Sequence, residues 1–368
     1  MWAMIVKEFR QLRRDRRTLA MMIVLPVLLL VVFGYAASFE VSSIPTLVTG
    51  PQAEQVAAQL PEPFDVDEVD PAASRADAED DLREGRVPVA LVTSDDGVTA
   101  LLDGSELFTA NTARTALASL GQGGSQASSA EVEVLFNEGL DTSTVMVPAL
   151  AGLILLFVGT VITSLGVVRE RQAGTLEQLA VMPLRPRDVF LGKIAPYFVV
   201  AALDLVMVLT VGVWLFDVPF RGSALVLGLG VLLFLFVTLG FGVLISTVSE
   251  NQGQAIQLAM MVLLPQVMLS GMIFPVQSMA AGVRWLSYLL PLTYFTQISR
   301  GVMVRGTSLG ALWQPFLFLT VLGLVIVVLA TLRFRRDLAP SPPRTGSPKA
   351  ADGDVSVPAT VAGSGAPS

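Results

Sequence analysis

Long apolar stretches recur along this chain and alternate with shorter polar segments. A helix needs about 20 mostly apolar residues to cross a hydrocarbon layer about 30 Å thick. Six stretches reach that length, at residues 18–37, 145–168, 194–216, 224–248, 256–274 and 312–332. The pattern predicts a membrane protein whose fold class is an all-α bundle of six transmembrane helices.

Composition supports a membrane protein. Hydrophobic residues make up 53% of the chain and charged residues 15%, with a mean hydropathy of +0.66, whereas soluble domains are roughly 45–50% apolar. Cysteine and histidine are both absent, which excludes disulfides, Cys/His zinc sites and a histidine general base. We therefore expect that this chain is not an enzyme and that it has no catalytic, cofactor-binding or metal site.

Lysines and arginines cluster before the first stretch, between the second and third, and after the sixth. Cytoplasmic flanks carry the excess of cations, so both termini should be cytoplasmic. Residues 38–143 hold four arginines against twenty acidic residues and should lie outside. Their β-rich runs at 44–48 and 87–92 alternate with helix-favouring segments at 72–84 and 106–120, and 121–129 is a Gly/Ser-rich loop. This predicts an inserted α/β extracytoplasmic domain.

The remaining segments complete the predicted architecture, in which 144–336 holds helices two to six. Residues 1–17 suit an amphipathic helix on the inner membrane face, or a simple basic orientation signal, before the first transmembrane helix at 18–37. A cleaved signal peptide is the alternative for 18–37, but the apolar run is longer than usual. An outer re-entrant segment at 276–305 should hold Trp285, Tyr288 and Tyr294 at headgroup level. The composition of the tail 337–368 predicts disorder.

The cytoplasmic loop 169–193 begins Arg-Glu-Arg-Gln-Ala-Gly-Thr-Leu-Glu-Gln-Leu. One face carries Leu176, Leu179 and Ala180, and the opposite face is charged. Such a segment suits docking to another protein, or it is a solvated connector. The pattern alone does not separate these two interpretations.

This loop resembles the cytoplasmic signature of type-2 ABC transporter permeases. Other segments agree in the same order along the chain, namely 7–26, 103–105 with Asn111, 269–275 and 290–294. The resemblance implies a bacterial plasma-membrane permease that pairs with a second copy or a homologous permease chain in the lipid bilayer. It also implies a separate ATP-binding cassette ATPase subunit, which would hold the ATP and magnesium, and no nucleic-acid partner.

By this resemblance, the residues that couple the chain to the ATPase subunit are Glu170, Arg171, Gly174, Thr175 and Glu177. The chain contains no G-x-x-x-x-G-K-[ST] phosphate loop, so the energy for transport should come from the partner. The resemblance suggests export of a hydrophobic or amphipathic substrate, such as a drug-like molecule or lipid.

Four polar residues inside predicted spans are candidates for the substrate path: Asp204, Gln257, Gln266 and Ser270. A charged group within a membrane helix is costly and can mark a functional site, but a paired or protonated carboxyl that faces the bundle is the favoured interpretation of Asp204. Helix packing is the favoured interpretation of Gln257, Gln266 and Ser270. Two alternative functions stay open: a membrane scaffold or receptor that uses its external domain, and an ion-gradient-driven secondary transporter.

Overall fold

The computed structural model of the chain describes residues 43–95, 97–120, 130–173 and 186–337. The predictions for 1–17, 18–37, 121–129 and the tail beyond Asp337 lie outside these residues. So do Gly174, Thr175 and Glu177 of the predicted coupling loop.

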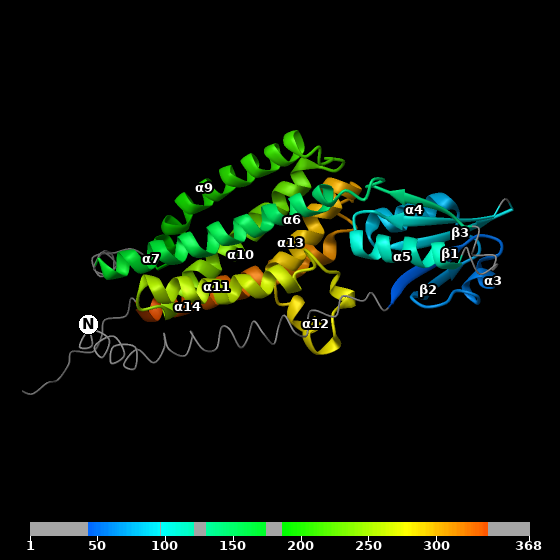
Figure 1. Ribbon diagram of the computed structural model, residues 1–368. Helices are drawn as coiled ribbons and strands as arrows, with labels where there is room; N and C mark the ends of the chain where they lie inside the picture. The colour runs from blue at the N-terminus through cyan, green and yellow to red at the C-terminus, as the bar shows by residue number, and fades with distance from the viewer. Residues whose placement is uncertain (1–42, 96, 121–129, 174–185, 338–368) are drawn as a thin grey trace, which may run out of the picture. The chain divides into compact units, whose positions relative to one another are not determined.

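The first described part is a five-stranded mixed sheet with helices packed on it (Figure 1). The strand order is β2-β1-β3-β4-β5, in which β1 pairs in parallel with β2 and β3, β3 and β4 are antiparallel, and β4 and β5 are parallel. Its elements are β1 (Ile44–Thr49), α3 (Ala53–Ala57), β2 (Phe64–Asp70), α4 (Arg75–Glu84), β3 (Val89–Ser94), β4 (Gly97–Asp103), α5 (Leu107–Leu120) and β5 (Glu131–Leu135).

Both faces of this sheet are covered, because apolar residues that are neighbours in sequence point to opposite sides of a strand. Val48 and Leu91 join one core with residues of α3 and α5. Leu47 and Ala90 join a second core with Leu82 of α4. The β-rich runs at 44–48 and 87–92 therefore contribute to the central strands β1 and β3, and the predicted strands and helices of this part are confirmed.

Helix α4 has well-defined signals at both ends. The Ser74 hydroxyl and the Asp77 carboxylate form a capping box at the start of the helix, and this pairing satisfies two free backbone N–H groups. Gly85 ends the helix in the left-handed conformation with φ of 72°, which glycine adopts without a steric penalty. The end of α4 is consequently fixed, and it is used in one of the sites described below.

The second described part is helical. Its elements are α6 (Thr142–Phe157), η2 (Val158–Ile162), α7 (Thr163–Gln172), α9 (Pro186–Leu215), α10 (Ala224–Val248), α11 (Gln252–Leu269), η3 (Val276–Ser278), α12 (Ala281–Ser287), α13 (Pro291–Arg300), η4 (Gly301–Arg305) and α14 (Trp313–Asp337). Helices α6 and α7 are continuous through the π-helical turn η2. Figure 1 shows this continuous α6–α7 helix running alongside α10, α11 and α14.

Within the described residues, four helices are long and apolar enough to cross a membrane: Thr142–Gln172, Ala195–Leu215, Ala224–Val248 and Trp313–Arg333. They match the second, third, fourth and sixth predicted spans. Helix α11 ends at Leu269, before Gly271 turns the chain with φ of 77°. It is therefore shorter than the predicted span 256–274, and the count of six spans stays a prediction.

Helix α10 is central to the bundle and contacts α7, α9, α13 and α14. The rings of Phe234 in α10 and Phe295 in α13 stack with their centroids 4.4 Å apart. Gly242 faces the Gly159 carbonyl so closely that an added Cβ would lie 2.9 Å from its oxygen. Helix α9 is peripheral, and Trp214 near its end is 90% exposed. In a membrane, that face of α9 meets lipid or another chain.

The aromatic residues of the predicted re-entrant segment divide into two groups. Trp285 and Tyr288 are more than half exposed, as side chains at a headgroup boundary require, but Tyr294 is only 5% exposed. Its ring stacks on Phe318 of α14, and its hydroxyl donates to the Tyr288 carbonyl at 2.6 Å. Tyr294 therefore packs against protein rather than facing outward, and the depth of the three aromatic residues in the membrane stays a prediction.

Candidate functional site

Arg171 joins the end of α7 to the end of α10. One terminal nitrogen of its guanidinium donates to the carbonyl oxygens of Ser246 at 2.9 Å and Ser249 at 3.1 Å. The last carbonyls of a helix lack partners within the helix and carry partial negative charge. Arg171 therefore caps α10 with a full positive charge supplied by another helix.

The start of α11 belongs to the same junction. The Gln252 side-chain amide donates to the Gln172 side-chain oxygen at 3.1 Å, and Asn251 caps α11 by accepting from the Gln254 N–H at 2.9 Å. We call Arg171, Gln172, Ser246, Ser249 and Gln252 the Arg171 junction. It couples the ends of three helices at the point where the predicted coupling loop begins.

The structure places two of the five predicted coupling residues, since Glu170 and Arg171 lie in the last turns of α7. Arg171 is part of the junction described above, and Glu170 directly precedes it in the chain. Gly174, Thr175 and Glu177 fall outside the described residues, and their roles stay predictions.

The predicted substrate-path residues have different surroundings. Asp204 on α9 and Gln257 on α11 each have a buried side-chain oxygen with no hydrogen-bond partner in the described part of the chain. Gln266 is fully buried; it accepts from the Leu292 N–H at 3.3 Å and donates to the Val262 carbonyl at 3.3 Å. Gln266 thus ties α11 to the start of α13, as the packing interpretation expects.

Ser270 follows the end of α11, and its hydroxyl oxygen accepts from the Met272 N–H at 3.3 Å. It is the member of the predicted path that lines a cavity shared with the sheet. This cavity is treated separately below.

A second site joins the sheet to the helices. The Arg305 guanidinium donates to the Asp103 carboxylate at 3.2 Å, and the Asp103 side chain is 1% exposed. The other oxygen of Asp103 accepts from the Ser105 N–H at 2.8 Å. Arg305 also covers Gly85, where an added Cβ would lie 2.6 Å from a guanidinium nitrogen. The absence of a side chain at Gly85 thus allows the Arg305 guanidinium to lie against the end of α4.

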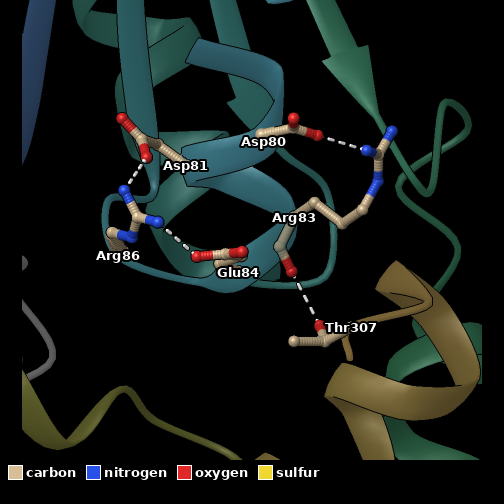
Figure 2. Close-up of polar contacts among 6 residues, drawn as sticks. All are labelled: Asp80, Asp81, Arg83, Glu84, Arg86 and Thr307. Atoms are coloured by element: carbon tan, nitrogen blue, oxygen red, sulfur yellow. Dashed lines mark hydrogen bonds and ion pairs between the residues drawn. The ribbon is translucent and has the colours of Figure 1, made fainter. Parts of the chain in front are cut away.

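Beside this ion pair, the Thr307 hydroxyl donates to the main-chain carbonyl of Arg83 at 2.7 Å. Figure 2 shows this contact at the end of α4, where the Arg83 guanidinium itself points toward Asp80. We call Arg83, Gly85, Asp103, Arg305 and Thr307 the Arg305 joint. The joint attaches the end of β4 and the end of α4 to η4 and the residues after it.

Sequence reasoning missed the Arg305 joint. The available signal was charge, because Arg300 and Arg305 lie beside an apolar stretch that is predicted to face outward, and cations are depleted on that side. Asp103-Gly104-Ser105 stood out only through the resemblance to the family. Nothing in the sequence pattern paired Asp103 with Arg305.

Glu106 lies near the joint at the start of α5 and is half-buried. Its carboxylate accepts from the Thr109 hydroxyl at 3.2 Å. Burial raises the pKa of Glu106, and the Asp103 charge raises it further, while Arg305 and Arg300 act in the opposite direction.

Across 43–95, 97–120, 130–173 and 186–337, no three acidic side chains converge in a way that could hold a metal ion.

With the fold and these sites in place, comparison with known proteins identifies the family. A model described as ABC-2 family transporter protein matches residues 16–332. The chain belongs to the ABC-2 transporter family. The match includes the predicted coupling loop, the sheet and the described helices as far as Leu332 in α14, so both sites lie within the family region.

Named relatives agree with this membership. The probable multidrug ABC transporter permease YbhS of Escherichia coli is 29% identical over 91% of this chain and 97% of its own length. The corresponding permease YbhR is 28% identical over 91% of this chain and 98% of its own length. The inner membrane transport permease YhhJ of Escherichia coli is 33% identical over 57% of this chain and 56% of its own length. The chain is therefore an ABC-2 permease, a membrane component of an ABC transporter.

Proposed function

We propose that this ABC-2 permease forms the translocation path of an ATP-driven exporter for hydrophobic or amphipathic molecules, such as drug-like compounds or lipids. Two copies, or this chain and a homologous permease, would build the path. A separate ATP-binding cassette subunit would bind ATP and magnesium and dock on the loop 169–193. The Arg171 junction is the observation that carries this proposal.

The junction explains how motion would spread from the loop. Arg171 makes two charge-assisted hydrogen bonds to the end of α10, and such bonds contribute about 1.5–3 kcal/mol. Gln252 connects the start of α11 to the same turn of α7. A displacement of the segment after Gln172 would therefore move α7, α10 and α11 together. Glu170, Gly174, Thr175 and Glu177 would contact the ATPase.

The proposal includes an orientation. With the loop 169–193 and both termini in the cytoplasm, the sheet would face outward. The Arg305 joint would then lie at the outer end of the path, opposite the Arg171 junction. Single cysteines introduced into this cysteine-free chain, as Glu131→Cys and Gln172→Cys, test the orientation. In intact cells, a membrane-impermeant thiol reagent should modify Glu131→Cys and leave Gln172→Cys unmodified until the cells are opened.

Copurification tests the function. We expect an ATPase with a phosphate loop to accompany the permease, and its activity in lipid nanodiscs to rise with transported compounds. Glu177→Lys should leave membrane insertion intact but remove stimulation and export. Normal export by this variant contradicts the assigned coupling role. Absence of any ATPase from the purified complex supports the scaffold or receptor alternative, or the ion-gradient-driven transporter.

Asp204 supports a second candidate, transport linked to an ion gradient. Its buried carboxylate oxygen has no partner among the described residues, and a buried carboxyl of this kind is often part of an ion or proton pathway. Asp204→Asn should abolish transport under this mechanism. Under the ATP-driven mechanism, the same variant should keep ATP-dependent export, because asparagine preserves shape and polarity at that position.

A further inference from the structure

A cavity of about 100 Å³ lies where the sheet meets the helices. The turn before α5 contributes Ser105 and Glu106, and α13 contributes Thr296 and Arg300. Arg305 adds a second guanidinium, and Ser270, Gln277 and Gln297 add further polar groups. The apolar lining residues include Phe108, Val145, Met146, Met272, Ile273 and Val276. The cavity is therefore lined by both charged and apolar side chains.

Several polar atoms of its lining are buried without a hydrogen-bond partner anywhere in the described residues. They are the hydroxyl oxygens of Ser105 and Thr296 and the Nε atoms of Arg300 and Arg305. Ser105 and Thr296 are at most 2% exposed. A buried polar group without a partner is costly. Four unpartnered groups around one cavity indicate that something else binds there.

The two guanidinium groups are nevertheless held firmly by their other nitrogens. Arg300 donates to the carbonyl oxygens of Gly271 at 3.1 Å and Met272 at 2.5 Å. Arg305 donates to Asp103. Each arginine is thus fixed by one edge while its Nε–H remains unused. Positioned donors of this kind are typical of binding sites, because little side-chain freedom is lost when a ligand arrives.

We infer that this cavity binds the phosphate or carboxylate head group of an amphipathic molecule. The unpartnered groups are two N–H donors and two hydroxyls, and oxyanions accept hydrogen bonds from both. A water molecule occupies about 30 Å³, so the cavity has space for one small head group. The apolar wall at Phe108, Met272 and Ile273 provides a surface for the attached chain.

Glu106 sets the charge of this site. When it is ionised, its carboxylate opposes an anion and offsets part of the charge of Arg300 and Arg305. When it is protonated, it becomes a donor toward a bound oxyanion. Replacing Glu106 with glutamine should therefore strengthen anion binding, which is the opposite of the effect of removing the arginine or hydroxyl groups.

The site extends the proposed function without depending on it, because binding can be measured on the purified permease without ATP or an ATPase. The probes are octyl phosphate, octanoate, inorganic phosphate and uncharged octanol, each titrated calorimetrically in a phosphate-free maltoside detergent. We expect octyl phosphate and octanoate to bind at least about tenfold more tightly than octanol. Equal affinity for octanol, or for inorganic phosphate and octyl phosphate, overturns the inference.

Substitutions of cavity-lining residues test whether octyl phosphate binds in this cavity. Arg300→Gln should weaken octyl phosphate binding about tenfold or more, and Thr296→Val about threefold to tenfold. Glu106→Gln should tighten it. Arg284→Gln is the matched arginine control, since Arg284 also donates to backbone carbonyls but does not line the cavity. Thr320→Val is the matched threonine control, since its hydroxyl donates to a carbonyl one turn earlier in α14.

If Arg300→Gln does not fold, the octyl phosphate affinity of Thr296→Val tests the inference instead, because valine keeps the shape of threonine. Unchanged affinity in Thr296→Val and Glu106→Gln overturns the inference and leaves water as the occupant. Native mass spectrometry separates two sources of the ligand. A phospholipid retained by the natural chain and lost from Thr296→Val identifies a membrane lipid. Octyl phosphate binding with no retained lipid identifies a transient molecule, such as cargo.

Discussion

The Arg305 guanidinium donates to the Asp103 carboxylate at 3.2 Å, and the two residues are 202 positions apart in the chain. Asp103 ends β4 and Arg305 ends η4, so this pair connects the sheet to the helical part. Both side chains are buried, at 1% and 10% exposure. A pair of this kind is costly to break, because removing one member leaves the other charge without compensation.

Asp103→Asn should loosen the joint strongly. Breaking a buried pair costs about 3–5 kcal/mol, so hydrogen exchange should accelerate in both 97–107 and 301–307. The double variant Asp103→Asn with Arg305→Gln should lose less than the sum of the single variants, because the charges are removed together. Arg114→Gln is the control, since Arg114 is exposed and bonds to Asn111 in its own helix. Additive losses would contradict the pairing.

Gly85→Ala should disturb the same joint from the opposite side. The left-handed conformation costs a non-glycine residue roughly 1–2 kcal/mol, and the new Cβ would lie 2.6 Å from an Arg305 nitrogen. Gly97→Ala is the matched control, because Gly97 has φ of 139° but nothing within 4 Å of its Cβ position. We expect Gly85→Ala alone to accelerate exchange at 301–307. Equal effects there from both variants would show that crowding of Arg305 is unimportant.

Arg171→Gln should separate ATP hydrolysis from transport. The variant loses the positive charge that caps α10 at Ser246 and Ser249. We expect basal ATPase activity to remain and cargo-stimulated activity in nanodiscs to fall about tenfold, as the loss of charged hydrogen bonds predicts. The exposed neighbour Arg169 provides the control Arg169→Gln. A normal stimulated rate in Arg171→Gln would remove the junction from the mechanism.

Glu106 should make stability depend on pH. Its pKa is raised by burial and by Asp103, against the opposing influence of Arg305 and Arg300. A carboxyl whose pKa is higher in the folded chain stabilises the fold below its ordinary pKa, and this contribution is lost as pH rises through the raised value. The melting temperature of the natural chain should therefore fall relative to that of Glu106→Gln as the pH is raised from acidic to neutral. A parallel pair of curves would contradict this assignment.

Local pattern predicted much of the secondary structure. The run at 44–48 became a central strand because Ile44, Thr46 and Val48 are β-branched, and helix α4 follows from its capping box and terminal glycine. The apolar stretch 224–248 became α10 with the same bounds. Helix α11 was less predictable, because Gly271 and the turn after it shorten a stretch whose composition continues to 274.

The side-chain contacts between helices could not be predicted from the local sequence pattern. Arg171 was predicted from the resemblance, but its two carbonyl partners belong to the end of another helix. Gln266 carried the same sequence signal as Gln257, yet it bonds to Leu292 and packs α11 on α13. Tyr294 carried the same aromatic signal as Trp285 and Tyr288, yet its ring packs against Phe318 of α14. Each outcome depended on which helix lay opposite, and hydropathy carries no such information.

The sequence by itself determined that this chain is a membrane protein with long apolar helices, a sheet-forming segment and no phosphate loop. Those properties follow from composition and short-range periodicity, which act within one element. Only the tertiary structure decided that Asp103 meets Arg305, that Arg171 caps α10, and that four unpartnered polar groups among the described residues surround one cavity. These contacts join residues far apart in the chain, and packing of the whole fold brings them together.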